Sequence, residues 1–328
     1  MKPEWVSSST LLGEPLGDLS IIRRALRGLN LQGPLKKTKT LKSEMRTKTT
    51  YQYTWIPVGA WLPALAVLIA QPLLAESFDG DSTQPRPVIA PPIVFQAAGP
   101  NAASIQSTVD QFRAALGGVN NGNTNGPLPT GRREINWDGG GSTNTSPGPT
   151  PFTVFLNTRG SVMETPGSGF VQAPASGLAD IFSNPSLATN FQAFSPVRLF
   201  AALDSTVTDV TFFVPGGGNI PAMTSGFGTI FADVDSPDGG GRGVRQSQVA
   251  GSSLIAYYDV SGHLLYKSAI PSSPGTATLS FFGIVFPEPR IAFVRIITGR
   301  KAAGKGLEPK VDLVVMDDFI YGEPQGIP

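Results

Sequence analysis

Apolar residues fill both faces of segment 226–235, GFGTIFADVD, until its last positions become acidic. A strand that is apolar on both faces is typical of the centre of a sheet covered on both sides. We therefore expect 226–235 to be a central core strand, paired with segments that follow it in the chain. Its end would bring Asp233 and Asp235 to the edge of the sheet.

Short apolar-rich segments recur after residue 150, separated by Gly and Pro. This spacing predicts an all-β fold, and we expect a jelly-roll-like antiparallel β-sandwich. The turn in DVSGH, 259–263, and the proline-containing link 286–290 predict two hairpins. The expected strands are 152–157, 169–172, 198–203, 207–214, 226–235, 253–260, 263–268, 279–286, 291–298 and 311–321.

One segment has helical periodicity. Ile105, Val109, Phe112 and Leu116 follow one another at spacings of four, three and four, and two glycines come directly after them. The pattern predicts one accessory helix at about 102–117, placed as a lid or plug over an open end of the sandwich.

The chain before this helix divides into three parts. Residues 1–44 form a basic extension, explained by a start-site artefact or, alternatively, by contact with a membrane surface. Residues 45–75 begin with basic positions and continue as a long uncharged run, which predicts an export signal cleaved after Ala75 or an uncleaved anchor. Residues 76–100 are a proline-rich lead-in in which 93–96 is either extended or a first edge strand. We expect 101–328 to be a single secreted or cell-surface domain.

Composition limits the chemistry. The chain has no cysteine and a single histidine, His263, so thiolate and clustered-imidazole metal sites are excluded. Any metal site must use oxygen ligands. The excess of Lys and Arg lies in the first 75 residues, so the main body lacks the cationic surface that nucleic acid requires.

Four aspartates adjoin apolar strand segments, where a carboxylate is costly unless it is solvated, hydrogen-bonded or bound to a cation. In VDLVVMDDFIYG, 311–322, alternation would place Asp317 on the same face as Val315 and Phe319. Calcium binds oxygen ligands of this kind. The sequence therefore predicts a Ca²⁺ site, and the alternative is a solvated rim whose carboxylates accept turn N–H groups. The expected ligands are Asp233, Asp235, Asp317 and Asp318.

The segment 131–141, GRREINWDGGG, holds a second group of polar residues. Alternation there predicts a short strand that buries Ile135 and Trp137 and leaves Glu134, Asn136 and Asp138 outward. Two carboxylates held about 5–9.5 Å apart across a cleft can hydrolyse a glycosidic bond, whereas ordinary loop carboxylates are solvated. Trp137 and Tyr258 can form an aromatic platform for sugar rings, or they can pack in the core.

Several blocks together resemble a family of exported bacterial proteins of undefined function, some of which carry PEP-CTERM sorting tails. These blocks are GRREINWDG, FSPVRLF, GFGTIFADVD, SSLIAYYDVSGHLLYKSAIP and VVMDDFIYGEP. The resemblance covers about residues 90–325. It implies a secreted β-sandwich similar to galactose-binding or carbohydrate-binding modules, and it implies no catalytic residues. Because neither an apolar span nor a basic cluster follows Glu323, we do not expect membrane sorting by such a tail.

The sequence thus predicts a secreted, non-enzymatic module that binds an extracellular glycan or another cell-surface ligand and is stabilised by calcium. Its ligand-binding residues would be Trp137, Asp138, Glu134 and Tyr258. The membrane would be contacted only through the signal or anchor segment. A self-assembling surface protein that joins copies through strand edges is the first alternative. A glycoside hydrolase that uses Glu134 and Asp138 is the second.

Overall fold

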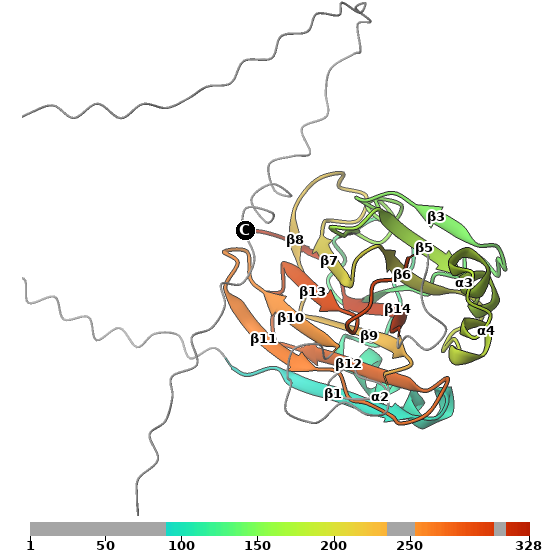
Figure 1. Cartoon of the computed structure of the whole chain (residues 1–328). Coiled ribbons are helices and arrows are strands. Elements are labelled where there is room, and N and C mark those ends of the chain that lie inside the picture. The colour runs from blue at the N-terminus through green and yellow to red at the C-terminus, as the bar shows by residue number, and fades with distance from the viewer. Residues whose placement is uncertain (1–89, 235–252, 305–312) are drawn as a thin grey trace, which may run out of the picture. The chain divides into compact units, whose positions relative to one another are not determined.

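The computed structural model describes residues 90–234, 253–304 and 313–328, which form two antiparallel sheets packed face to face (Figure 1). This confirms the predicted all-β sandwich with a small accessory helix. The basic extension, the signal or anchor segment 45–75, most of the lead-in and Asp235 lie outside the described residues. Within the described ranges, no helix is both long and apolar enough to span a membrane.

We call the larger sheet, of eight strands, sheet A and the smaller, of five, sheet B. Sheet A has the order β1 (Ile93–Gly99), β12 (Leu279–Val285), β9 (Gly226–Ala232), β14 (Val315–Gly322), β6 (Leu199–Leu203), β5 (Gly169–Ala173) and β3 (Ser146–Gly148), and β2 (Arg132–Ile135) also pairs with β14. Sheet B has the order β11 (Leu264–Ala269), β10 (Leu254–Tyr258), β13 (Phe293–Ile297), β7 (Val207–Phe212) and β4 (Ser161–Glu164). A separate pair joins β8 (Ala222–Met223) to β15 (Gln325–Gly326).

The strand β9 is central, as its apolar pattern predicts. It lies between β12 and β14, and all its residues are buried. Phe227 and Phe231 belong to the core between the sheets, whereas Ile230 belongs to a second core on the other side of sheet A. Both faces of β9 are apolar because both faces of sheet A are covered.

The helix α2 (Ala102–Ala115) begins at Asn101, whose side chain accepts a hydrogen bond from the backbone N–H of Ser104. It packs along β1 and β12 on the outer face of sheet A (Figure 1). The expectation that the helix covers an open end of the sandwich is therefore wrong. The helix instead covers the outer face of sheet A, which is apolar and would otherwise be exposed to water. The ring of Phe112 rests on the cross-strand glycine pair Gly228 and Gly283, where a Cβ on Gly228 would lie 2.9 Å from the ring.

Two helices were not expected from the sequence. These are α3 (Ala175–Phe182) and α4 (Leu187–Asn190), and Leu178, Phe182 and Leu187 from them extend the same outer core. In addition, β1 pairs with β12 from Ile93 onward. The sandwich therefore starts earlier than the expected boundary at residue 101, and segment 93–96 is an edge strand.

The hairpin predicted at 259–263 is confirmed, since β10 and β11 are antiparallel neighbours and Gly262 has a φ of 80° in the turn. The second expected hairpin, at 286–290, is wrong: β12 lies in sheet A and β13 in sheet B, so the link crosses between sheets. The expected strand 152–157 is also wrong. Phe152 makes one β-bridge and a turn follows, and these apolar residues pack against Trp137 instead of forming a ladder.

A buried ion pair fixes the C-terminal end of β14. Arg133 donates from Nε and Nη2 to the two carboxylate oxygens of Glu323, each at 2.6 Å. Arg133 also donates to backbone carbonyls of the loop before β2, and Glu323 accepts from the N–H of Leu128 and the amide of Asn121. Because these groups are hydrogen-bonded, the pair ties the loop to the sheet without leaving a buried charge uncompensated.

Candidate functional site

A β-bulge interrupts β14 at its two aspartates. Met316 pairs with Phe231 and Phe319 pairs with Thr229, so β14 has one residue more than β9 over this interval. The extra residue shifts the alternation by one position, so Val315 is in the outer core whereas Phe319, four residues later, is between the sheets. The expectation that Val315, Asp317 and Phe319 share one face is wrong for this reason.

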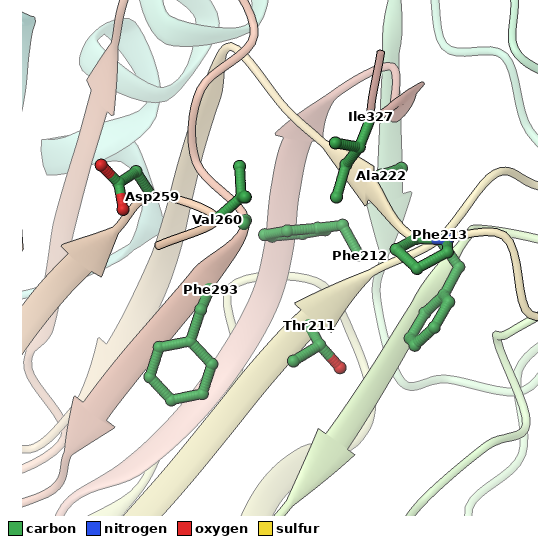
Figure 2. A pocket seen from close by; sticks show the side chains of 10 residues that line it. Thr211, Phe212, Phe213, Ala222, Asp259, Val260, Phe293 and Ile327 are labelled. Atoms are coloured by element: carbon green, nitrogen blue, oxygen red, sulfur yellow. The ribbon is translucent and has the colours of Figure 1, made fainter. Parts of the chain in front are cut away.

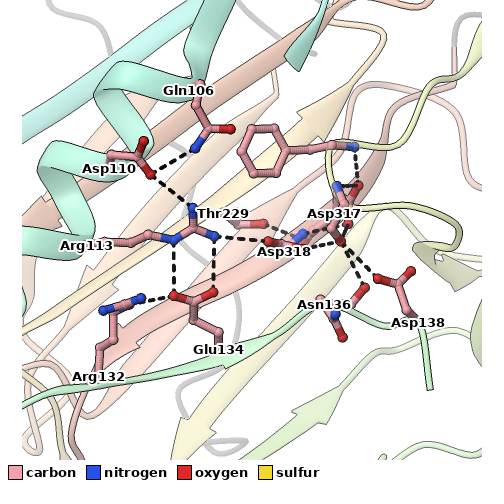
Figure 3. Close-up of polar contacts among 12 residues, drawn as sticks. Gln106, Asp110, Arg113, Arg132, Glu134, Asn136, Asp138, Thr229, Asp317 and Asp318 are labelled. Carbon is pink, nitrogen blue, oxygen red and sulfur yellow. Dashed lines mark hydrogen bonds and ion pairs between the residues drawn. The ribbon is translucent and has the colours of Figure 1, made fainter. Parts of the chain in front are cut away.

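The bulge also turns both carboxylates toward the segment that precedes β6 (Figure 3). Asp317 Oδ2 accepts a 2.6 Å hydrogen bond from the backbone N–H of Phe194, and its Oδ1 accepts from the N–H of Asp318 at 2.9 Å. The carbonyl oxygen of Asp317 accepts from the Trp137 indole at 3.2 Å and from the Thr229 hydroxyl at 3.3 Å. The polar groups that the bulge removes from the ladder are thus satisfied by side chains and by another loop.

Three carboxylates converge on the hydroxyl of Ser195. Its Oγ lies 2.6 Å from Asp318 Oδ1 and 3.3 Å from both Asp317 Oδ1 and Asp138 Oδ2. The other oxygen of Asp138 accepts from the N–H groups of Val197 and Arg198, at 2.6 and 2.9 Å. A serine hydroxyl donates only one hydrogen, so the three carboxylates compete for it. We call Asp138, Asp317, Asp318 and Ser195 the aspartate cluster.

Two members of the aspartate cluster, Asp317 and Asp318, hold protons at higher pH than exposed carboxyls do. Burial, and next the neighbouring Asp318, raise the pKa of Asp317 well above its ordinary value. Burial raises the pKa of Asp318 to about 6, although hydrogen bonds from Ser195 and Asp317 and the charge of Arg113 oppose the shift. Both carboxyls therefore keep their protons to higher pH than ordinary aspartates, and a proton on either one removes the repulsion between them.

An arginine of α2 borders the aspartate cluster. Arg113 donates to both oxygens of Glu134, at 3.1 Å each, and lies 3.5 Å from Asp318 (Figure 3). Arg132 donates to the same Glu134. The structure thus brings Glu134 and Asp138 to one region, but both oxygens of Glu134 already bind guanidinium groups. Asp138 is 4% exposed and binds backbone N–H groups. Both carboxylates are engaged in holding the fold together.

Trp137 lies in the core and presents no face for sugar stacking, which corrects the expected aromatic platform. Its side chain is 1% exposed and stacks on Phe200 at a centroid distance of 3.7 Å. Its backbone has a φ of 63°, a strained conformation for a bulky residue. The bend at Trp137 is followed directly by Asp138, and packing around the indole stabilises it.

The four aspartates expected to bind calcium are not brought together as one group. Asp317 and Asp318 share the aspartate cluster, Asp233 is buried at the end of β9, and Asp235 lies outside the described residues. Across the described ranges, no group of three or more His, Asp or Glu side chains is arranged to hold a metal ion. The reason is local: the Ser195 hydroxyl lies among the carboxylates and backbone N–H groups take several of their oxygens. Calcium binding stays a prediction.

Sequence reasoning missed Ser195 and Arg113. Ser195 stands in the block FSPVRLF, and apart from its apolar neighbours nothing in that block sets it apart from the other serines of the chain. Arg113 is the basic residue in the last turn of α2, a position that is usually explained by the helix dipole alone. Neither residue is near β14 or β2 in the chain, so no spacing pattern could connect them to the aspartates.

The outer face of sheet B carries a different group of polar and aromatic residues. Alternate residues of its strands, such as Val210, Tyr257 and Val294, belong to the core between the sheets. Their neighbours therefore point outward. The register places Tyr258, Phe293 and Thr211 side by side, and beside them Arg295, Asp209 and Glu164. We call Tyr258, Phe293, Arg295, Asp209 and Glu164 the outer patch.

Direct contacts organise the outer patch. Arg295 donates from Nε and Nη2 to the two oxygens of Asp209, at 2.8 and 2.7 Å, and its guanidinium lies 5.6 Å from the centre of the Phe293 ring. The rings of Tyr258 and Phe293 are 5.5 Å apart and inclined by 57°. Burial, together with the nearby Asp209, raises the pKa of Glu164. Of the four expected ligand-binding residues, only Tyr258 belongs to this patch, and it is half-buried.

Known proteins add no further assignment. The chain matches no protein-family model, no curated protein and no solved structure. The resemblance to exported bacterial β-sandwich proteins therefore stays a prediction.

Proposed function

We propose that this chain is an exported, non-enzymatic module that binds an extracellular glycan through the outer patch of sheet B. The observation that carries the proposal is the position of Tyr258. Its ring lies on the outward face of the sandwich, next to Phe293 and to the Arg295–Asp209 pair. Export itself rests on the signal-like segment 45–75.

The chemistry of the outer patch suits a sugar ring. A pyranose has an apolar C–H face that packs on an aromatic side chain and hydroxyls around its rim that both donate and accept hydrogen bonds. Within the described residues, the pair with Asp209 uses two of the five N–H groups of Arg295. The remaining N–H groups and the carboxyl group of Glu164 provide donors and acceptors for those hydroxyls.

A glycan array followed by isothermal titration calorimetry tests this proposal. We expect Tyr258→Ala to weaken binding about tenfold, which corresponds to about 1.4 kcal/mol. Tyr258→Phe keeps the ring and is the matched control, with a loss of twofold or less. Wild-type affinity in Tyr258→Ala would contradict the assignment of the outer patch.

The first alternative, assembly through strand edges, also has support. Among the described strands, β1 pairs only with β12, and Ile93 on it is 61% exposed. The strand β11 is the edge of sheet B, and Leu264 on it is 50% exposed. Exposed apolar edge strands are templates for pairing with another chain. Concentration-dependent sedimentation that Val94→Lys abolishes would favour this function over glycan binding.

A further inference from the structure

A small apolar pocket adjoins the outer patch. It lies where the end of β7, the β10–β11 turn, β8 and the C-terminal residues meet (Figure 2). The side chains that matter most for its character are those of Phe212, Phe213, Ala222, Val260, Phe293 and Ile327. Ile327 is held there by its own N–H, which donates to Pro221 O, and by the pairing of β15 with β8.

The pocket is both narrow and poor in polar partners. It leaves about 30 Å³ for the centres of entering atoms, whereas one water needs at least about 10–15 Å³, so two or three non-hydrogen atoms fit. Asp259 contributes to the rim, but its Oδ1 accepts from the N–H groups of Ser261 and His263, and Figure 2 shows its carboxylate turned away from Ile327. A hydroxyl placed inside would lose its hydrogen bonds to water without replacement.

Two residues belong to both the pocket and the outer face. Phe293 and Thr211 line the pocket and are register neighbours in sheet B, and Phe293 is also paired with Tyr258. The chain continues from Tyr258 directly into Asp259 and Val260 at the rim. A ring stacked on Tyr258 would therefore lie next to Phe293, which is one wall of the pocket.

We propose that this pocket receives the methyl end of an acetamido group, so that the ligand is an N-acetylated glycan. This inference rests on the proposed function and specifies the class of ligand. The methyl and carbonyl carbons match the size and apolar lining of the pocket. The amide N–H and oxygen stay at the mouth, where water can bind them.

The test compares two tetrasaccharides with the same β-1,4-linked backbone, chitotetraose in its fully N-acetylated form and cellotetraose, which differ in the acetamido group. Calorimetry with the full chain should show chitotetraose binding about tenfold tighter or more, as expected for one apolar group in a fitted pocket. Ala292→Leu fills the pocket from a half-buried lining position and should remove the preference. Ala269→Leu, the same change on the exposed edge strand β11, should keep it.

A second pocket variant guards against a folding defect in Ala292→Leu. Val260→Trp covers the mouth from an exposed turn position and should also abolish the preference. Equal affinity of the wild type for both tetrasaccharides would overturn this inference and leave the glycan function intact if Tyr258→Ala still weakens binding. A preference that survives both pocket variants would overturn it too. If neither tetrasaccharide binds, the inference is rejected. The glycan array then tests the proposed function independently.

Discussion

The protonation of Asp318 makes the stability of this fold depend on pH in an unusual direction. Its pKa in the folded chain is about 6, whereas an unfolded chain has about 3.9. The folded state therefore binds the proton more tightly than the unfolded state. The stability that this group contributes is fully present below about pH 4 and is lost as the pH rises through about 6.

The size of the effect follows from the shift. A difference of about two pKa units corresponds to about 3 kcal/mol at about 1.4 kcal/mol per unit. The side chain of Asp318 is 3% exposed, so solvent screening does not reduce this figure substantially. Asp318→Asn replaces the titrating group with a neutral one of the same shape. About a third of this contribution is already lost at pH 4.5, so the stability of this variant relative to the wild type should rise by about 2 kcal/mol between pH 4.5 and pH 8.

The assay is urea unfolding of both proteins at pH 4.5 and at pH 8, because carboxyls that do not contact Asp318 titrate equally in the two proteins and cancel in the difference. Asp317 is the exception, since Asp318 contributes to its raised pKa. For a domain of this size, about 2 kcal/mol corresponds to about 4–8 °C in unfolding temperature, which provides an independent check. Ser195→Ala removes a hydrogen bond that favours the ionised form of Asp318. We expect this variant to lose stability at pH 8 relative to pH 4.5 even more than the wild type.

A stability difference between Asp318→Asn and the wild type that stays constant with pH, within about 0.5 kcal/mol, would refute the reasoning. It would mean that the Asp318 carboxyl is ionised across the whole pH range. Arg113 and the surrounding hydrogen-bond donors would then stabilise the ionised form by more than burial destabilises it. If the stability of the variant relative to the wild type instead fell as the pH rises, the pKa of Asp318 in the folded chain would lie below its unfolded value.

Three further predictions concern the core and the aspartates. Arg133→Met leaves the carboxylate of Glu323 buried without its partner and should destabilise the fold by about 3–5 kcal/mol in urea unfolding, unless Glu323→Gln is added. Gly228→Ala places a Cβ 2.9 Å from the Phe112 ring and should cost about 1–3 kcal/mol; an unchanged unfolding midpoint would show that α2 can shift freely. If calcium binds the ionised aspartates, millimolar Ca²⁺ should raise the unfolding temperature by several degrees at pH 8 and less at pH 5, and Asp317→Asn should abolish the rise. If Ca²⁺ changes the unfolding temperature at neither pH, the predicted calcium site is rejected.

The sequence alone determined those features that depend on neighbouring positions in the chain. The strand β9 carries no charged residue before Asp233 and is apolar on both faces apart from Thr229, and this pattern correctly predicted a strand buried on both faces. The spacing of Ile105, Val109 and Phe112 predicted α2, and the Ser261-Gly262 turn predicted the β10–β11 hairpin. In each case a local period or a local turn preference decides the outcome, so no distant residue is needed.

The tertiary structure alone decided where those elements go and what their polar residues do. A single extra residue in β14 reverses the faces of every later side chain, and nothing in VDLVVMDDFIYG marks the bulge. Helix α2 covers a sheet face because that face is apolar in the assembled sheet, which no helical pattern reveals. Trp137 is buried because Phe200 stacks on it, although the two residues are far apart in the chain.

The polar groups illustrate the same limit. The aspartate cluster joins β14 to the loops after β2 and before β6, and Arg113 of α2 adjoins it. The outer patch joins residues of β4, β7, β10 and β13 through strand register. From the sequence, carboxylates in strands were known to need compensation, because a buried charge is costly. Which donors compensate them depends on contacts between segments more than a hundred residues apart, and only folding brings those segments together.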